Sequence, residues 1–403
     1  MGSKQQLLIV GAGMATGYLL NALSAQEHEL EITVFGREAE LCYNRVLLSS
    51  ALAGEVSLDD LKMLNDSAVR GVTFHADTIV SRIDTTQRFV HCDTGSCYAY
   101  DKLVVATGSN VSIQQASWAD IEGVRFFRTL QDTHFLRKRA DDAGVAVVVG
   151  GGLLGLEAAH GLNALGHATT VVHRNAHLMN RQLDAVGATQ LRADLEERGI
   201  GFSLKCTLAE VLHKNGRVVG VLLNDGQILP CDLLLFATGI TPNVSVAQTA
   251  GLECDKGILV NAHMGSSADQ VYALGECAQW GNHCVGLVAP IRAQADVLSS
   301  VLCGKSTTQY AVQDAPTHLK VSGIDIYRAG ELDDAAEQLV FRDKRAGVYR
   351  RLIVRQNKLV GAVLVGDKQC GNWYADLIRS STDISGIRGQ LMFGPALAQA
   401  LAA

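Results

Sequence analysis

The sequence lacks the features that mark a membrane-spanning, secreted or nucleic-acid-binding protein. No apolar run in its 403 residues approaches the ~20 that a membrane helix needs. The formal net charge is −6, so a basic surface for nucleic acid is not expected. The first residues run directly into an expected strand and do not have the layout of a signal peptide. We therefore expect a cytoplasmic protein with no membrane and no nucleic-acid partner.

Paired redox cysteines are also missing. The chain has 10 cysteines but no C-x-x-C pair. Four residues separate Cys92 from Cys97, but both lie in a hairpin-like stretch, HCDTGSC, and not on a helix. Reduced structural thiols are the simplest interpretation. This argues against a disulfide reductase, and also against an iron–sulfur cluster, a structural zinc or another metal site.

Proline (5 residues) and aromatic side chains (5%) are scarce, whereas glycine (40 residues) and apolar residues (48%) are abundant. This composition is typical of an α/β protein with glycine-rich turns, and the length predicts two or three domains.

The stretch VAVVVGGGLLGLE (145–157) predicts a buried strand, a glycine turn and the start of a helix. Gly150, Gly152 and Gly155 complete a G-x-G-x-x-G motif: one glycine for the tight turn, one for close approach to a pyrophosphate, one for helix–strand packing. A purely structural glycine turn is the alternative.

A second glycine loop, LLIVGAGMATG, stands near the N-terminus with Gly11, Gly13 and Gly17. Thr16 occupies the usual place of the third glycine, which predicts slightly looser packing there. Two such loops suggest two dinucleotides, a bound flavin dinucleotide and a nicotinamide dinucleotide that reduces it. An A-T-G triplet ends a strand after each loop, at residues 106–108 and 237–239. The repeat predicts two Rossmann-like domains, the second inserted in the first.

Other stretches fit this scheme. Glu38, just after the expected strand Glu31–Phe35, is the candidate for holding a ribose hydroxyl, with a solvated carboxylate as the alternative. Arg45 is either a flavin partner or an ordinary helix-start arginine. Alternation from Val72 to Val90 predicts a β-meander. Gly275 and Glu276 end a further strand, and Pro290 lies in the first turn of the helix after it.

At this point the chain resembles the two-dinucleotide FAD/NAD(P)H oxidoreductases. Within them it is most similar to the flavin module of assimilatory NAD(P)H nitrite reductase large subunits and to stand-alone electron-transfer subunits of assimilatory nitrate reductase. The resemblance extends over essentially the whole chain. The matching stretches are YNRVLLSS, YDKLVVATGS, VVGGGLLGLEAA, HLMNRQLDAVGATQLRADLEERGI, FATGITPN, YALGECAQWGN, GLVAP and YRRLIVRQNKLVGAVLVGD.

The resemblance implies an FAD domain at residues 1–110 and 243–312, an NAD(P)H domain at 111–242, and a C-terminal α+β domain at 313–403. The positions that it places against FAD are Gly11, Gly13, Ala15, Glu38, Arg45, Ala106, Thr107, Gly108, Arg128, Gly275, Glu276 and Pro290. Those that it places at the NADH or NADPH site are Gly150, Gly152, Leu153, Leu154, Gly155, Glu157, His173, Arg174 and Gly239. Glu157, beside the nicotinamide, and Arg45 are the expected catalytic positions; a structural helix glutamate is the alternative for Glu157.

The sequence departs from the family in two places. Full-length nitrite reductase subunits continue into iron–sulfur and sirohaem regions, so this chain is not expected to reduce nitrite itself. His173 and Arg174 replace the acid that commonly selects NADH, which predicts that NADPH is accepted.

The function that we expect is electron transfer from NAD(P)H through FAD to a separate protein. The expected acceptor is the catalytic subunit of a nitrate or nitrite reductase, in nitrate assimilation. A rubredoxin or ferredoxin reductase is the alternative within enzymes, and an NAD(P)H-responsive redox-sensing binding protein is the alternative outside them. We expect a monomer or homodimer.

A basic stretch near the C-terminus suggests a docking face for an acidic partner, with a solvated strand face as the alternative. Its members are Arg342, Lys344, Arg345, Arg350, Arg351, Arg355 and Lys358.

Overall fold

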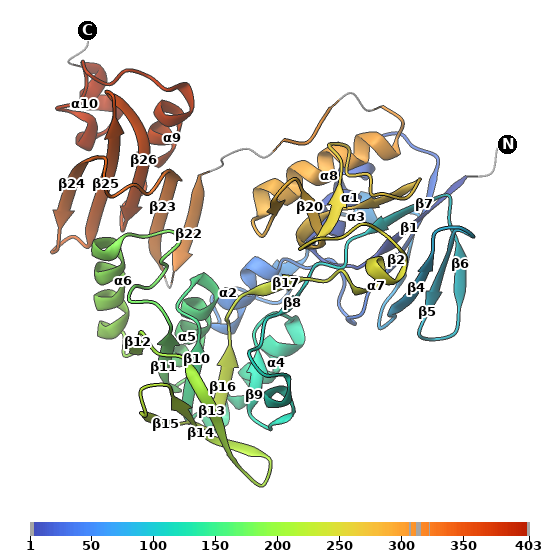
Figure 1. The fold of residues 1–403 in the computed structure, drawn as a ribbon, viewed down its shortest axis with the longest axis horizontal. Helices are drawn as coiled ribbons and strands as arrows, with labels where there is room; N and C mark the ends of the chain where they lie inside the picture. Colours follow the sequence, from blue (N-terminus) through green and yellow to red (C-terminus); the bar gives the residue numbers. More distant parts are fainter. Residues whose placement is uncertain (1–3, 306–307, 312–315, 322, 401–403) are drawn as a thin grey trace.

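The computed structural model describes residues 4–305, 308–311, 316–321 and 323–400 (Figure 1). It contains two parallel five-stranded sheets, a five-stranded C-terminal sheet and several smaller ones. This confirms the α/β class predicted from the glycine loops. The expected domain limit between residues 312 and 313 lies outside the described residues, and the other limits stay predictions.

The first parallel sheet has the strand order β19-β7-β1-β2-β3. The pairing of all five is parallel. Apolar side chains dominate because both faces of the sheet are covered. The helices α1 and α8 pack against each other on one face, and residues of the antiparallel strands over 80–92 pack on the other. The strands are β1 (Gln5–Val10), β2 (Leu30–Phe35), β3 (Val72–His75), β7 (Lys102–Val105) and β19 (Val271–Ala273). The helices are α1 (Met14–Ser24), α3 (Asp66–Val69) and α8 (Val288–Leu302).

The prediction of a β-meander over Val72–Val90 is wrong for its first strand. β3 pairs in parallel with β2 and extends the main sheet. Only the later strands form an antiparallel sheet, β4 (Val80–Asp84), β5 (Phe89–Cys92) and β6 (Cys97–Ala99). Alternation alone does not distinguish these two pairings, because it records only which face is buried.

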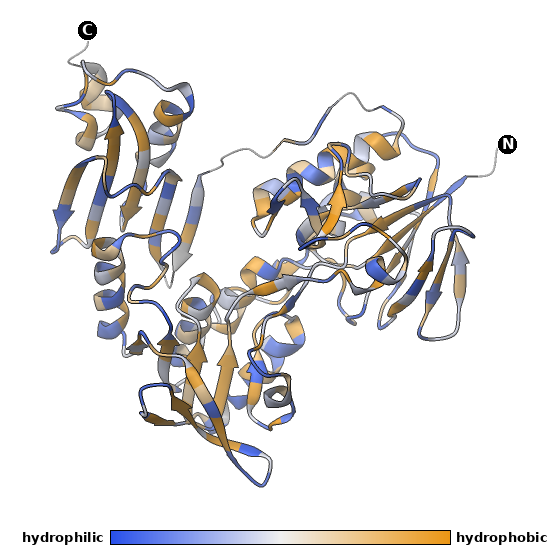
Figure 2. Cartoon of the chain, in the orientation of Figure 1, coloured by the Kyte–Doolittle hydropathy of each residue, from blue (hydrophilic) through white to orange (hydrophobic). Residues whose placement is uncertain are grey.

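The second parallel sheet repeats the first, with the order β12-β11-β10-β16-β9. In Figure 2 its central strands β10 and β16 are predominantly hydrophobic, in line with the burial of Val148 and Leu234. The strands are β9 (Val124–Phe126), β10 (Val145–Val149), β11 (Ala168–His173), β12 (Gly201–Leu204) and β16 (Leu233–Phe236). The helices are α4 (Leu130–Lys138), α5 (Leu153–Ala164) and α6 (Ala185–Glu197). An antiparallel sheet of β13 (Leu208–Lys214), β14 (Arg217–Leu223) and β15 (Ile228–Pro230) extends from it.

Two antiparallel segments join the parallel sheets. β8 (Ser109–Val111) leaves the first sheet, β17 (Ile240–Pro242) returns to it, and the two pair. The Thr107 hydroxyl donates to the carbonyl of Asn243 at 2.6 Å, and the Thr238 hydroxyl donates to the carbonyl of Ser112. The threonine of each A-T-G therefore hydrogen-bonds to the other connecting segment. The second sheet is inserted in the first unit, as the repeat predicted.

The C-terminal sheet is antiparallel, in the order β22-β23-β26-β25-β24. The helix α9 (Gly371–Ser380) covers one face. The other face packs on α5 and α6, beside which the sheet lies in Figure 1. The strands are β22 (Thr317–Val321), β23 (Ile324–Gly330), β24 (Glu337–Asp343), β25 (Val348–Arg355) and β26 (Lys358–Val365). Within the described residues, no helix is both long and apolar enough to cross a membrane.

Candidate functional site

The first glycine of each loop lies directly over an A-T-G alanine. Gly11 has a φ of +110°, and a Cβ built on it would lie 2.2 Å from the carbonyl oxygen of Ala106. Gly150 has a φ of +126°, and its Cβ would lie 2.3 Å from the carbonyl oxygen of Ala237. Only glycine fits both the turn and this close approach. The two loops are thus built in the same way on the two sheets.

The second glycine of each loop faces open space. Gly13 and Gly152 are the N-caps of α1 and α5, and neither helix has a side-chain cap or an acidic residue in its first turn. A Cβ on either glycine would meet no atom within 4 Å. The first backbone N–H groups of both helices therefore remain available to an anion at the positive end of the helix dipole. This arrangement fits a dinucleotide pyrophosphate at each loop.

The third position differs between the loops. A Cβ on Gly155 would lie 1.9 Å from the carbonyl oxygen of Gly150, so a side chain is excluded there. In the first loop Thr16 is fully buried, and its hydroxyl donates to the carbonyl of Gly11 at 2.5 Å. A Cβ on Gly17 would make only ordinary contacts, with Met63 and Cys42. A hydrogen bond therefore holds the first loop where close packing holds the second.

Two ion pairs lie at the carboxyl edge of the first sheet. Arg45 contacts Glu38 at 2.5 Å, and the Tyr43 hydroxyl donates to the other oxygen of Glu38, also at 2.5 Å. Arg128 contacts Glu276 at 2.6 Å. A guanidinium nitrogen of Arg45 donates to the carbonyl of Arg128 at 3.0 Å, which joins the pairs. Four of the predicted FAD residues therefore come together from separate parts of the chain.

Ser109 belongs to the same network and was not predicted. Its hydroxyl accepts from Arg128 at 2.6 Å and donates to Glu276 at 2.7 Å. The sequence held a signal, because the first A-T-G continues into Ser109 whereas the second continues into Ile240. A polar residue after only one of the two A-T-G triplets indicates a role that is specific to that dinucleotide unit.

Of three further predicted FAD positions, Gly275 contacts the first loop, Gly108 lies at the ion pairs, and Pro290 lies on α8. Gly275 lies against Ala15, since its Cβ would approach that of Ala15 to 2.8 Å, and its N–H donates to the side chain of Gln294. Gly108 has a φ of +66° and lies beside Arg128 and Glu276. Pro290 lies in the first turn of α8, as the sequence predicted.

The second loop is surrounded by residues of the predicted NAD(P)H site. Leu153 and Leu154 open α5, with Leu154 exposed, and Gly239 follows β16 with open space around its Cα. His173 ends β11 and is buried, and its Nδ1 accepts from the N–H of Gly151 at 3.0 Å. Burial lowers the pKa of His173, so the ring is neutral at pH 7 and supports the loop. Arg174, the next residue, is exposed.

Glu157 lies on α5, where this helix packs against α2 (Leu48–Leu52). The Ser49 hydroxyl donates to its carboxylate at 2.9 Å. Burial raises the pKa of Glu157 to about 7; the Ser49 hydrogen bond opposes this shift and the charge of Glu55 adds to it. His160 lies 3.6 Å from Glu55. This acid-rich contact between the two dinucleotide units was not predicted, since sequence spacing does not relate α2 to α5.

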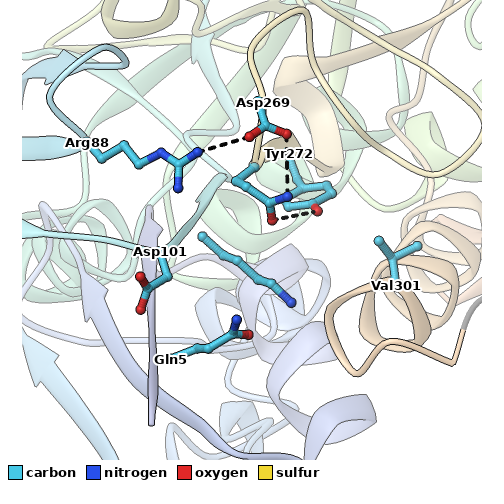
Figure 3. Close-up of a pocket in the computed structure, with 8 residues that line it drawn as sticks. Gln5, Arg88, Asp101, Asp269, Tyr272 and Val301 are labelled. Carbon is cyan, nitrogen blue, oxygen red and sulfur yellow. Dashed lines mark hydrogen bonds and ion pairs between the residues drawn. The ribbon is translucent and has the colours of Figure 1, made fainter. Parts of the chain in front are cut away.

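A polar hollow elsewhere on the first sheet is not part of this site. Figure 3 shows it lined by Gln5, Asp101 and Tyr272, with Arg88 paired to Asp269 at 2.9 Å. It lies where β1, β7 and β19 begin, whereas open α/β sheets bind ligands at the carboxyl ends of their strands.

The cysteines form no pair at the site. All ten are free thiols. Cys92 and Cys97 lie on β5 and β6, in the small antiparallel sheet. Cys42, beside Tyr43, is buried, and burial raises its pKa to about 12, so it stays protonated. Among the residues that the structure describes, no cluster of histidine, cysteine or carboxylate side chains is arranged to hold a metal.

Two members of the basic stretch are buried in the C-terminal sheet. Arg350 and Arg351 are only 7% and 3% exposed. Successive residues of β25 point to opposite faces of the sheet, and here α9 covers one face and α6 the other. Arg350 contacts Asp367, and Arg355 contacts two acidic residues between β23 and β24. The expectation of a basic surface is therefore wrong for Arg350 and Arg351, while the other five members of the stretch are exposed: Arg342, Lys344, Arg345, Arg355 and Lys358.

Comparison with known proteins agrees with this geometry. Residues 5–300 match the family described as pyridine nucleotide-disulphide oxidoreductase. The chain belongs to this family. The fit of both glycine loops to a dinucleotide pyrophosphate agrees with this family. Residues 316–382 match the C-terminal domain of rubredoxin NAD+ reductase.

Two relatives from Bacillus subtilis (strain 168) are each 37% identical to this oxidoreductase. One is an NAD(P)H nitrite reductase, aligned over 95% of this chain and 48% of its own length. The other is an assimilatory nitrate reductase electron transfer subunit, aligned over 96% and 51%. The chain thus spans about half the length of these relatives. The crystal structure of NADH:rubredoxin oxidoreductase from Clostridium acetobutylicum superimposes with a TM-score of 0.78, at 25% identity over 95% of this chain and 97% of that one.

Proposed function

We propose that this oxidoreductase takes a hydride from NAD(P)H onto FAD and passes the electrons to a separate redox protein. The observation that carries the proposal is the pair of uncapped, open glycine loops on two sheets joined by β8 and β17. Bound FAD supplies hydride acceptance and stepwise release of electrons. The absence of paired thiols among the described residues favours transfer without a disulfide intermediate.

In this proposal the chain supplies position and charge. The N–H groups at the starts of α1 and α5 hold the two pyrophosphates. The Arg45–Glu38 and Arg128–Glu276 pairs fix polar groups along the flavin dinucleotide. We assign residues 1–110 and 243–312 to FAD binding, 111–242 to NAD(P)H binding and 313–403 to the C-terminal domain, with the site residues named from the sequence.

The cofactor assignment has a direct test. Purified protein is expected to be yellow and to release FAD, not FMN, on heating. Anaerobic addition of NADPH or NADH should bleach the flavin absorbance. Colourless protein that FAD does not reconstitute would overturn the assignment.

The acceptor that we favour is the catalytic component of a nitrate or nitrite reductase. The names of the two Bacillus relatives support it, and their greater length leaves room for a further redox centre. Reduced protein should be reoxidised by such a component in stopped-flow mixing. Reoxidation no faster than by buffer would count against it.

A rubredoxin or ferredoxin acceptor is the second candidate. The match of residues 316–382 and the near-complete overlap with the clostridial enzyme favour it. Stopped-flow reoxidation by rubredoxin, ferredoxin and the nitrate or nitrite reductase component, at equal concentrations, separates the candidates. Slow flavin reduction by both coenzymes would instead support an NAD(P)H-responsive sensor. We place the protein in the cytoplasm, as a monomer or homodimer, which fractionation and sedimentation can check.

A further inference from the structure

The segment of residues 174–184, between β11 and α6, borders the second glycine loop. The carbonyl of Gly151 accepts from the N–H of Met179 at 2.9 Å, and its N–H donates to His173 just before the segment. A Cβ on Gly151 would lie 2.7 Å from the His173 ring and 2.9 Å from Leu178. The carbonyl of this loop residue is therefore bonded to the segment and its N–H to the residue just before it, so the position of the segment affects the shape of the loop.

The C-terminal sheet holds the far end of this segment. One oxygen of Asp184 accepts from the N–H groups of Val186 and Gly187, which caps α6. The other accepts from the Tyr349 hydroxyl at 2.7 Å and from Arg351 at 2.9 Å. The Asp184 and Arg351 side chains are only 11% and 3% exposed. The segment is thus tied to β25 by a buried charge pair whose carboxylate is fully hydrogen-bonded.

A second tie lies closer to the glycine loop. Arg328, on β23, donates to the backbone carbonyl of Arg181 at 2.7 Å. Arg351 also contacts Asp334 of its own domain at 2.6 Å, so the guanidinium is itself held in place. Two strands of the C-terminal sheet, β23 and β25, therefore hydrogen-bond to the segment at two points.

We propose that the C-terminal sheet positions the coenzyme-binding loop. Arg328, Tyr349 and Arg351 act as positioning residues for NAD(P)H through the 174–184 segment. Without these ties the segment is anchored by Gly151 and by the start of α6, and the glycine loop loses the fixed neighbour that sets its shape. The inference rests on the proposed function in one respect, the binding of NAD(P)H at residues 150–155.

The experiment uses the full-length, FAD-loaded protein. Arg328→Met, Tyr349→Phe and Arg351→Met each remove one tie. Arg355→Met is the matched control, because Arg355 pairs with Glu331 and Asp333 inside the C-terminal domain. The measurements are the Kd for NADP+ and NAD+ by calorimetry, KM and kcat with a small dye, and hydrogen–deuterium exchange of residues 174–184.

We expect Kd and KM to rise about tenfold in the three variants, in the range found for positions that act through neighbours. The kcat at saturation and the FAD content should stay near wild type, and exchange in the segment should accelerate. The control should change none of these. Arg328→Met loses a bond to an exposed carbonyl, and Tyr349→Phe keeps its ring, so both test the inference even where Arg351→Met does not fold.

Wild-type affinity for both coenzymes in Arg328→Met and Tyr349→Phe would overturn the inference and leave the proposed function intact. If the unaltered protein binds neither coenzyme, the proposed function fails, and this inference fails with it.

Discussion

Ser49 and Glu157 are joined by a 2.9 Å hydrogen bond across the contact between α2 and α5. Ser49 lies four residues after Arg45 in the first unit, and Glu157 follows the glycine loop of the second. The bond therefore connects the two dinucleotide units. Because burial raises the pKa of Glu157 to about 7, this carboxyl changes its protonation near neutral pH.

The Glu157→Gln variant should lose a pH dependence of stability. Between pH 4.5 and about 7 the folded protein holds a proton that the unfolded chain has released, so wild-type stability falls as the pH rises. The loss reaches up to about 3 kcal/mol by pH 8, at 1.36 kcal/mol per pKa unit. The measurement is the apparent free energy of unfolding in urea, for both proteins, from pH 4 to 8.

The neighbours of Glu157 provide the controls. Glu55→Gln removes a charge that raises the pKa of Glu157 and should reduce the wild-type pH dependence; Ser49→Ala should enlarge it. Parallel stability curves for wild type and Glu157→Gln would contradict the assigned protonation.

Alanine substitutions at Gly13 and Gly11 of the first loop should have different effects on stability. Gly13→Ala places a Cβ in open space at an ordinary φ of −92°, so the apoprotein should melt close to wild type. Its FAD affinity should fall at least about tenfold, because the methyl group occupies the approach of the pyrophosphate. Gly11→Ala meets the Ala106 carbonyl and should lower the melting temperature of the apoprotein as well. Unchanged FAD affinity in Gly13→Ala would show that the dinucleotide lies elsewhere.

Coenzyme choice should depend on Arg174. Its exposed guanidinium suits a 2′-phosphate, whereas the neutral, buried His173 does not carry the charge for that role. Arg174→Ala should lower kcat/KM for NADPH by about ten- to a hundredfold, the worth of a charged hydrogen bond, and change NADH much less. Arg137→Ala, on the exposed side of α4, removes the same charge as a control. Equal losses for both coenzymes would rule out a 2′-phosphate contact.

Replacing Cys92 and Cys97 by serine should leave NADPH-driven dye reduction within about twofold of wild type, since both lie on the small antiparallel sheet and no step of the proposed transfer uses a thiol. The check is steady-state turnover per bound FAD. A collapse of turnover in a folded, FAD-loaded variant would show that a thiol takes part.

The sequence by itself determined the elements whose signals are local. A glycine with positive φ, an uncapped helix start and an apolar strand are each encoded within a dozen residues, so both loops and the repeated A-T-G were readable. The insertion followed from the order of those repeats. Four residues that the family resemblance placed against FAD also came together in the structure, as two ion pairs: Glu38, Arg45, Arg128 and Glu276.

Only the tertiary structure decided which surfaces are covered and which charges meet. The stretch around Arg350 and Arg351 has the spacing of an exposed strand, yet both guanidinium groups are buried, because helices cover both faces of the C-terminal sheet. Asp184 and Arg351 are 167 residues apart in the chain, and Ser49 and Glu157 are 108 apart. Sequence spacing carries no information on such pairs, since they form only when separately folded units pack and exclude water from the groups between them.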